Sequence, residues 1–157
     1  MRETAVRIRS RYVWLIAGWT LSVAVLMIAV PLLVGARLPE PIAVEWTSTG
    51  SPESSSSLRD FLVGKLVWWL VVAAVWSALV LRGVLRERAT ALAAAVMAVF
   101  GWVMLGTVVL TTIANLDAPD FRDATELSGE GWLVLGALPV AWAGWRVGGR
   151  ETVGAAE

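Results

Sequence analysis

Four long apolar segments, separated by shorter polar ones, dominate the pattern of the chain. Residues 12–36 and 89–116 carry no charged side chain, and residues 61–81 are apolar apart from Lys65. The last segment, residues 131–147, is charge-free over only 15 positions. A helix needs about 20 mostly apolar residues to cross a bilayer, and a lysine in its first turns can extend its charge to the interface. The pattern therefore predicts four transmembrane helices over these ranges, the fourth being the shortest.

The first apolar segment also has features of a secretory signal. It follows basic residues and ends in the small residues of the Val34–Ala36 stretch. The apolar part of a signal peptide spans only about 7–15 residues, however, which is much shorter than residues 12–36. We therefore expect an uncleaved transmembrane helix here.

The basic side chains are distributed unevenly between the polar segments. Nine of the 13 Lys and Arg residues lie near the N-terminus, in the second connection or from Arg146 onward, whereas the two other connections hold Arg37, Arg59 and Arg122. Lys and Arg concentrate on the cytoplasmic side of membrane proteins, so both termini are predicted to be cytoplasmic. The cytoplasmic segments are then residues 1–11, 82–88 and 148–157, and the extracytoplasmic ones are residues 37–60 and the acidic loop 117–130.

The composition supports a membrane protein and excludes several classes of function. Hydrophobic residues make up 57% of the chain and charged residues 17%, whereas soluble domains are about 45–50% apolar. With no His and no Cys, the chain lacks the commonest general base and the thiol nucleophile. We therefore predict no enzymatic activity and no cofactor, and the net charge of zero gives no reason to expect nucleic acid. The strong preference for Arg over Lys is typical of a GC-rich bacterial genome, which predicts a bacterial cell membrane protein.

The first extracytoplasmic loop has a pattern that predicts order. Pro39 and Pro41 restrict the backbone to an extended start. Ile42, Val44 and Trp46 then alternate with smaller or polar residues, which is typical of a strand with one apolar face.

A turn and a helix start follow in the same loop. The stretch Thr47–Gly50 predicts a turn, because glycine adopts positive φ easily. Pro52 follows the turn, and Ser57 with Asp60 three positions later has the spacing of a helix cap. We therefore predict an all-α polytopic membrane protein of four transmembrane helices, with an ordered extracytoplasmic loop after the first helix.

This loop resembles the signature of a known family. A bacterial membrane family of unknown function carries Leu-Pro-x-x-Ile-Pro-x-His-Trp-x-x-x-Gly-x-Pro directly after its first transmembrane helix, and it includes the sporulation-delay-toxin immunity proteins. Ala43 stands here in place of the second proline and Glu45 in place of the histidine. The resemblance covers about residues 15–80 and implies a membrane protein of the immunity or signalling type. The residues that match the signature are Leu38, Pro39, Pro41, Ile42, Val44, Trp46, Gly50 and Pro52.

Acidic residues are the remaining candidates for chemistry. Glu45 is a candidate ligand contact, because the resemblance places it where relatives carry His, although a solvated carboxylate is the alternative that we favour. In the acidic loop, Asp117, Asp120 and Asp123 recur every three residues, and oxygen-rich loops can bind Ca²⁺. The spacing of an EF-hand is absent, so we expect a solvated loop and no metal site.

Small residues recur at helical spacing in the third and fourth helices. Small side chains on one face allow two helix backbones to approach closely in a membrane. The general abundance of Ala accounts for the spacing equally well. Pro139 predicts a kink in the fourth helix. The predicted packing residues are Ala94, Ala98, Gly101, Ala137, Ala141 and Gly144.

Three functions fit these features. The first is a signalling or immunity protein that senses or blocks something outside the cell through the first loop. The second is an accessory subunit that docks on a transporter or another membrane complex. The third is a small-molecule permease that acts as an oligomer, which the lack of ionisable residues deep in the helices disfavours. The expected partners are the lipid bilayer and, as candidates, another membrane protein or further copies of the chain.

Overall fold

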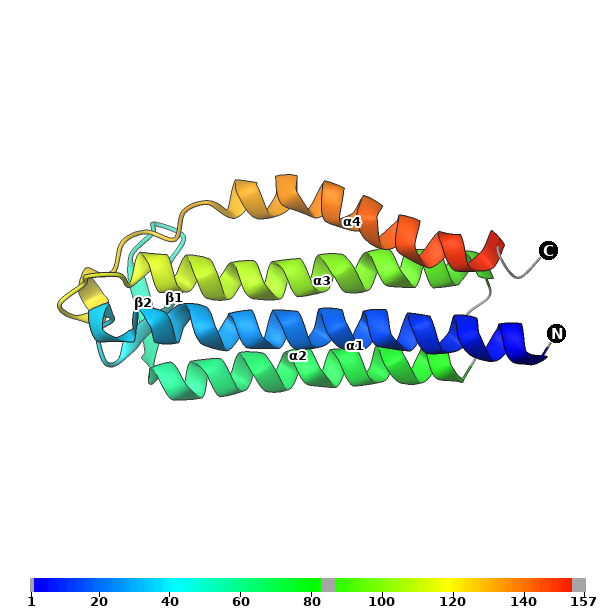
Figure 1. Ribbon diagram of the computed structural model, residues 1–157. Helices are drawn as coiled ribbons and strands as arrows, with labels where there is room; N and C mark the ends of the chain where they lie inside the picture. The colour runs from blue at the N-terminus through cyan, green and yellow to red at the C-terminus, as the bar shows by residue number, and fades with distance from the viewer. Residues whose placement is uncertain (1, 83–86, 154–157) are drawn as a thin grey trace.

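Four long helices form an elongated bundle in the computed structural model, which describes residues 2–82 and 87–153. Both termini lie at one end of the bundle, and residues 34–57 and 115–129 lie together at the other end, here called the head (Figure 1). The predicted cytoplasmic turn and tail fall partly on residues 83–86 and 154–157, outside the described residues. The helices are α1 (Arg2–Leu33), α2 (Leu58–Leu81), α3 (Glu87–Ala114) and α4 (Glu130–Val153).

The helices agree with the predicted ranges except at two ends. α1 begins at Arg2, well before residue 12, because no Gly or Pro interrupts the basic N-terminal segment. It ends at Leu33, and the short 3₁₀ helix η1 (Gly35–Arg37) then turns the chain into the head. α4 continues through Pro139 and extends to Val153. These two extensions shorten the terminal segments, whereas the loops of the head, residues 34–57 and 115–129, are about as long as the predicted loops 37–60 and 117–130.

Three helices are long and apolar enough to cross a membrane. The qualifying stretches are Trp14–Leu33 in α1, Leu58–Leu79 in α2 and Thr90–Ala114 in α3. Many of their large apolar side chains face outward, and such continuous apolar surface is not tolerated by a soluble monomer. The chain is therefore suited to the membrane. α4, the fourth predicted span, is not among these three helices.

Trp69 of α2 lies at the centre of the core formed by α1, α2 and α3. Its side chain is fully buried, its indole Nε1 donates to the carbonyl of Thr20 at 3.0 Å, and its ring stacks on Phe100 at 6.1 Å. Val23 and Met27 of α1 are also fully buried in this core. One large ring thus contacts the two neighbouring helices and sets the spacing of the bundle.

α4 packs against α3 through glycines near the termini. A Cβ atom added at Gly144 would lie 2.8 Å from the Ala94 carbonyl oxygen and 3.0 Å from the Ala98 Cβ, and one at Gly148 would lie 2.8 Å from the Ala91 Cα. Only a residue without a side chain fits such an approach. Ala94, Ala98 and Gly144, three of the predicted packing residues, thus meet in one close contact between α3 and α4, and Gly148 belongs to it as well.

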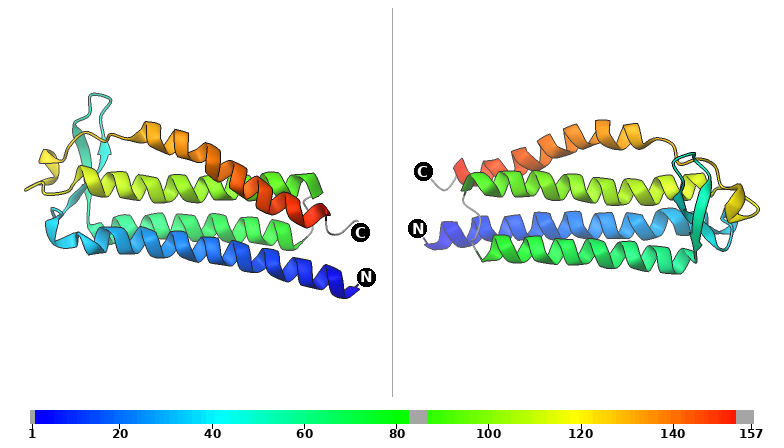
Figure 2. Two further views of the ribbon diagram at one scale, coloured as in Figure 1. Left: turned by 45° about the horizontal axis from the view of Figure 1, so that its top comes forward. Right: turned by 180° about the vertical axis from the view of Figure 1, so that it is seen from behind.

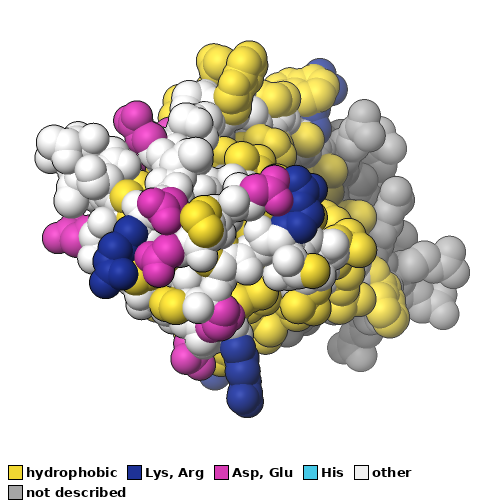
Figure 3. Space-filling model, turned by 90° about the vertical axis from the view of Figure 1, so that its left-hand side faces the viewer, with side chains coloured by type: hydrophobic (Ala, Val, Ile, Leu, Met, Phe, Trp, Pro, Cys, Tyr) yellow, Lys and Arg dark blue, Asp and Glu magenta, His cyan; other side chains and the backbone are white. Residues whose placement is uncertain are grey.

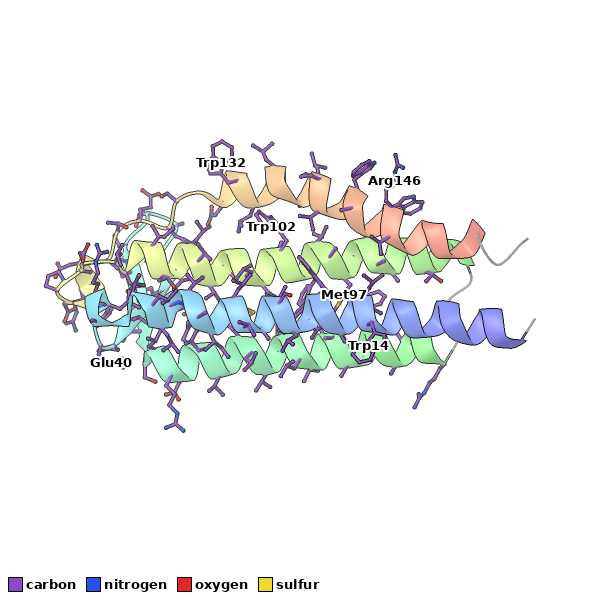
Figure 4. All side chains as sticks on the ribbon, in the orientation of Figure 1. Trp14, Glu40, Met97, Trp102, Trp132 and Arg146 are labelled. Carbon is purple, nitrogen blue, oxygen red and sulfur yellow. The ribbon has the colours of Figure 1, made fainter. Side chains whose placement is uncertain are left out.

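Toward the head, α4 separates from α3 (Figures 1 and 2). The ring of Trp102 fills the space between them, close to Gly136, and its Nε1 donates to the Leu133 carbonyl at 2.9 Å (Figure 4). Gly101 does not share this interface. A Cβ atom there would meet the rings of Trp19 and Trp69, which come from α1 and α2.

The head contains a β-hairpin that follows η1. Strand β1 (Ile42–Trp46) pairs antiparallel with β2 (Pro52–Ser56), with Ile42 opposite Ser56 and irregular register near Glu45. The strand at residues 42–46 was predicted from its alternation. The second strand was not, so the fold is mostly helical with a two-stranded sheet and is not purely all-α.

Candidate functional site

The head is the candidate site, and Asn115 at the end of α3 fixes the hairpin within it. The Ala43 N–H donates to Asn115 Oδ1 at 2.7 Å, and Asn115 Nδ2 donates to the Ala43 carbonyl at 2.9 Å. The same Nδ2 group donates to the Thr111 carbonyl at 2.9 Å. Asn115 is only 1% exposed, and a buried polar group is costly unless it is hydrogen-bonded. The Asn115 amide therefore pairs with the N–H and the carbonyl of Ala43 at the free edge of β1, as a neighbouring strand would.

A second link joins the end of η1 to the residues after α3. Arg37 donates from Nε to Asp117 Oδ1 at 2.9 Å and from its Nη2 atom to Oδ2, and the Asp117 N–H donates to the Arg37 carbonyl at 2.9 Å. The hydrogen bond from Arg37 holds the pKa of the Asp117 carboxyl below its usual value, and the same bond raises the pKa of Arg37. Asp117 has a φ of 61°, a conformation that Asp tolerates better than most residues.

Trp46 makes the third link. Its Nε1 donates to the Thr125 carbonyl at 3.0 Å, and the Thr125 N–H in turn donates to the Ala114 carbonyl at the end of α3 at 2.8 Å. The acidic loop is thereby held between the hairpin and the bundle. A Cβ atom at Gly50 would lie 2.8 Å from the side chain of Glu126, so the hairpin tip also contacts this loop.

The turn and the helix start agree with the sequence predictions. Gly50 has a φ of 84°, and its N–H donates to the Thr47 carbonyl at 3.0 Å. The Thr47 N–H donates to the Ser51 carbonyl at 2.8 Å and closes the turn. The Asp60 N–H donates to Ser57 Oγ at 3.0 Å, as expected of a helix cap. Local hydrogen bonds therefore define both ends of β2.

The residues of the family signature have mostly structural positions. Ile42 and Pro39 are buried, and Leu38 packs against the core as a partly buried side chain. Pro41 is exposed and follows a cis peptide bond after Glu40. Pro52 begins β2, opposite Trp46. The signature thus connects α1 to the hairpin and to the acidic loop.

Glu45 has a structural partner that its sequence context did not indicate. It is exposed and lies opposite Ser54, whose Oγ donates to Glu45 Oε2 at 2.8 Å. The carboxylate therefore bridges the two strands while the side chain stays exposed. This geometry gives Glu45 a role in the hairpin without excluding it as a ligand contact.

The acidic loop spreads its carboxylates apart. Asp120 accepts the Arg122 N–H at 2.9 Å and caps the short helix η2 (Phe121–Asp123), while Asp117 pairs with Arg37. Among the residues that the structure describes, no group of acidic side chains could hold a metal ion. Figure 3 looks onto the head and shows acidic and basic side chains dispersed among neutral ones. The described residues of the head thus present a mixed polar surface.

Two functional positions escaped the sequence predictions. Asn115 was not singled out, because an asparagine at a helix end is ordinary and its partner Ala43 lies 72 residues away. Gly148 was placed in the tail, although its spacing of four from Gly144 is the small-residue pattern that allows close helix packing. That spacing could have identified Gly148. For Ala137 and Ala141, the structure gives partial burial and nothing that separates them from their neighbours.

Comparison of the chain with protein-family models, with curated proteins and with solved structures finds no match in any of the three. The resemblance to the immunity-type membrane family therefore stays a prediction.

Proposed function

We propose that the chain crosses a bacterial cell membrane four times, with both termini in the cytoplasm and the head outside. Three apolar helices and the nine basic residues of the N-terminal segment, the second connection and the C-terminal tail support this topology. α4 has 24 residues, about 36 Å of helix, and runs beside α3 back to the termini. Its outer face carries exposed apolar side chains such as Trp132, Leu138 and Trp142. A helix that lies along a spanning helix over this length crosses the bilayer with it.

Within this topology, we infer that the protein recognises a molecule outside the cell and serves in immunity or signalling, without enzymatic activity. The observation that carries this inference is the fixed head. Asn115, Arg37 and Trp46 join the hairpin to α1, α3 and the acidic loop. A loop that only connected two helices would need none of these contacts, whereas a binding surface gains affinity from being preorganised.

Single-cysteine labelling tests the topology directly. The chain contains no Cys, so a single substitution provides the only thiol. We expect Ser48→Cys at the hairpin tip to react with a membrane-impermeant maleimide in intact cells, and Ala155→Cys to react only after lysis. Labelling of Ala155→Cys in intact cells would contradict the fourth crossing. A cytoplasmic protein with a reactive thiol is the control, and it must stay unlabelled before lysis to show that the cells are intact.

A protection assay tests the function. The protein is expressed in sensitive bacteria, which are then challenged with secreted membrane-permeabilising proteins or peptides from competing strains. We expect survival to depend on the exposed hairpin tip, so Ser48→Arg and Glu45→Gln should reduce protection at unchanged membrane levels. Ser128→Arg, which adds the same charge at an exposed position close to the start of α4, serves as the matched control. Protection that is unaffected by both hairpin variants would argue against the head as the recognition surface.

The accessory-subunit hypothesis has less support from the packing. Two of the small residues that would suit docking to another membrane protein are occupied within the chain, with Gly144 against Ala94 and Gly101 against Trp19 and Trp69, whereas Gly18 and Gly64 meet no atom within 4 Å. Purification in mild detergent distinguishes the two hypotheses. A heteromeric partner in stoichiometric amount would favour the subunit, and a lone chain would favour recognition. The permease hypothesis is disfavoured because no charged residue lies within residues 12–36 or 89–116.

A further inference from the structure

A groove of about 430 Å³ lies between α1 and α2 at the head end of the bundle. Ile28 and Leu32 of α1 and Leu62 and Leu66 of α2 line its length with apolar side chains. At its head end the lining changes to two charged side chains, Glu40 from the segment before β1 and Arg59 from the first turn of α2. The groove is therefore apolar along the helices and carries one charge of each sign at its mouth.

Both charges at the mouth lack a partner within the part of the chain that the structure describes. Glu40 and Arg59 are exposed and take part in no hydrogen bond or ion pair there. The other cations near the head are engaged: Arg37 with Asp117, Arg122 with Asp120, and Lys65 over the ring of Phe61 at 5.5 Å. Figure 4 shows Glu40 at the head end, beside the start of α2.

The depth of this mouth matches a membrane interface. Arg59 and Asp60 lie in the first turn of α2, and from Leu66 onward the helix is free of charge to Leu81. If the bundle spans the bilayer as proposed above, the charged mouth lies among the lipid headgroups and the apolar part of the groove enters the hydrocarbon. A phospholipid has the same division into a charged end and an apolar chain.

We propose that this groove binds one phospholipid whose headgroup carries a primary ammonium, of the phosphatidylethanolamine type. An acyl chain lies between Ile28, Leu32 and Leu62, the phosphate contacts the Arg59 guanidinium, and the ammonium donates to the Glu40 carboxylate. An arginine fork suits phosphate oxygens, and charge-assisted hydrogen bonds are the stronger kind. The proposal rests on the membrane location inferred above and adds the chemistry of the lipid.

Glu40 and Arg59 together would select among phospholipid headgroups. The quaternary ammonium of a choline lipid has no N–H to donate, so it can meet Glu40 only through its diffuse charge. A glycerol headgroup has no cation, and its net negative charge is repelled by Glu40. The ethanolamine headgroup alone among these three offers both an anion for Arg59 and a hydrogen-bonding cation for Glu40.

Native mass spectrometry of the detergent-solubilised protein tests the proposal. The protein is mixed with equal amounts of ethanolamine, choline and glycerol phospholipids that carry identical acyl chains. We expect a single retained lipid, with the ethanolamine form about tenfold preferred, the ratio that one hydrogen bond to a charged group supplies. Glu40→Gln should remove the preference for ethanolamine over choline, and Arg59→Gln should weaken binding of all three lipids.

Glu53→Gln and Arg122→Gln are matched controls, because they make the same charge changes on the head away from the groove. They should leave the lipid pattern of the wild type unchanged. The proposal would be overturned if the wild type retained the three lipids equally, or if the control variants changed lipid binding as much as Glu40→Gln and Arg59→Gln. Either result would mean that the retained lipid is nonspecific annular lipid. All four side chains are exposed, and an unchanged thermal midpoint verifies that each variant folds.

The outcome is separable from the proposed function. Lipid retention in detergent does not depend on which side of the membrane the head faces or on what the head recognises. If Ser48→Cys reacted only after lysis, the proposed topology would be wrong, and a failed protection assay would contradict the proposed function. Neither result would change the lipid preference. Loss of the preference at Glu40→Gln in the predicted direction supports the lipid site whatever those experiments give.

Discussion

α3 is contacted in different ways at its two ends. Near the termini, Gly144 and Gly148 bring the backbone of α4 against Ala91, Ala94 and Ala98. At the head, Asn115 meets the backbone of Ala43 through hydrogen bonds from a buried amide. The first contact depends on the absence of side-chain atoms, and the second depends on a particular set of donors and acceptors.

The difference follows from the surroundings of each end. Along the apolar helices, lipid competes equally for apolar surface, so helices associate through close backbone packing. In the head, the chain leaves the helices and its backbone N–H and C=O groups need new partners. Substitutions that add volume should therefore damage the first region, and substitutions that remove a donor should damage the second. Four experiments test this contrast, from the largest expected effect to the smallest.

Asn115→Leu should be the most destabilising change. It removes the partner of both the N–H and the carbonyl of Ala43, and each buried group left unpaired costs about 1–3 kcal/mol. Thr112→Val is the matched control. Thr112 is also buried, but its hydroxyl donates only to the Val108 carbonyl of its own helix. Thermal unfolding in detergent should show a much lower midpoint for Asn115→Leu alone. Similar midpoints for both variants would mean that the amide does not fix the hairpin.

Gly144→Ala should destabilise the contact of α4 with α3. The new Cβ would lie 2.8 Å from the backbone oxygen of Ala94, and overpacking of this kind costs about 1–3 kcal/mol. Gly64→Ala is the control, because a Cβ there meets nothing within 4 Å and alanine favours the helix. We expect opposite shifts of the thermal midpoint for the two variants. Destabilisation of the same size at both positions would contradict the close approach.

Trp46→Phe should loosen the head without affecting the bundle. It keeps an aromatic ring but loses the hydrogen bond to the Thr125 carbonyl, at a cost of about 0.5–1.5 kcal/mol. Limited proteolysis in right-side-out vesicles should cut the acidic loop faster in this variant. Trp132→Phe, at an exposed ring on α4, should leave the rate unchanged. If the loop of the wild type is already cut as fast as that of Trp46→Phe, the link to Thr125 does not hold it.

Asp117→Asn should have the smallest effect, and this effect should depend on pH. The pKa of Asp117 is lowered by the hydrogen bond from Arg37, so the pair stabilises the head fully above the ordinary carboxyl value of about 4 and loses this contribution as the pH falls through the lower folded pKa. Arg37 stays charged throughout, since its pKa is raised. Asparagine tolerates the positive φ of this position, so only the charge changes.

The measurement compares thermal midpoints of the wild type and of Asp117→Asn at pH 6 and at pH 3. The wild type should lose more stability on acidification than the variant. The gap between them should be small at pH 6, because the pair is exposed to solvent. A wider gap at pH 3 than at pH 6 would have the wrong sign for a depressed carboxyl pKa.

The parts of the head that depend on neighbouring residues could be predicted from the sequence. The alternation from Ile42 to Trp46, the glycine at position 50 and the spacing of Ser57 and Asp60 each specify a local conformation, and β1, the turn and the helix cap all follow from them. The extents of α2 and α3 followed from the length of their apolar runs for the same reason.

The parts that depend on distant residues could not be predicted. The Ser-rich second strand has little tendency to be extended by itself and becomes a strand by pairing with β1. Gly101 has the helical spacing of Ala94 and Ala98 but contacts Trp19 and Trp69, because α4 has already separated from α3 at that level. One helix face can thus meet two different neighbours along its length, and a periodic pattern does not reveal where the change occurs.

The hydrogen bonds that complete the head also determine when the head can fold during synthesis. Arg37 of η1 and the hairpin residues Ala43 and Trp46 find their partners 80, 72 and 79 residues later in the chain. At a synthesis rate of about 5–20 residues per second, these partners emerge roughly 4–16 seconds after the hairpin. During that interval the first loop lacks its hydrogen bonds to Asn115, Asp117 and Thr125. The head can therefore be completed only after α3 is in place, and a nascent chain stopped before Asn115 would carry both hairpin strands without their links to α3 and the acidic loop.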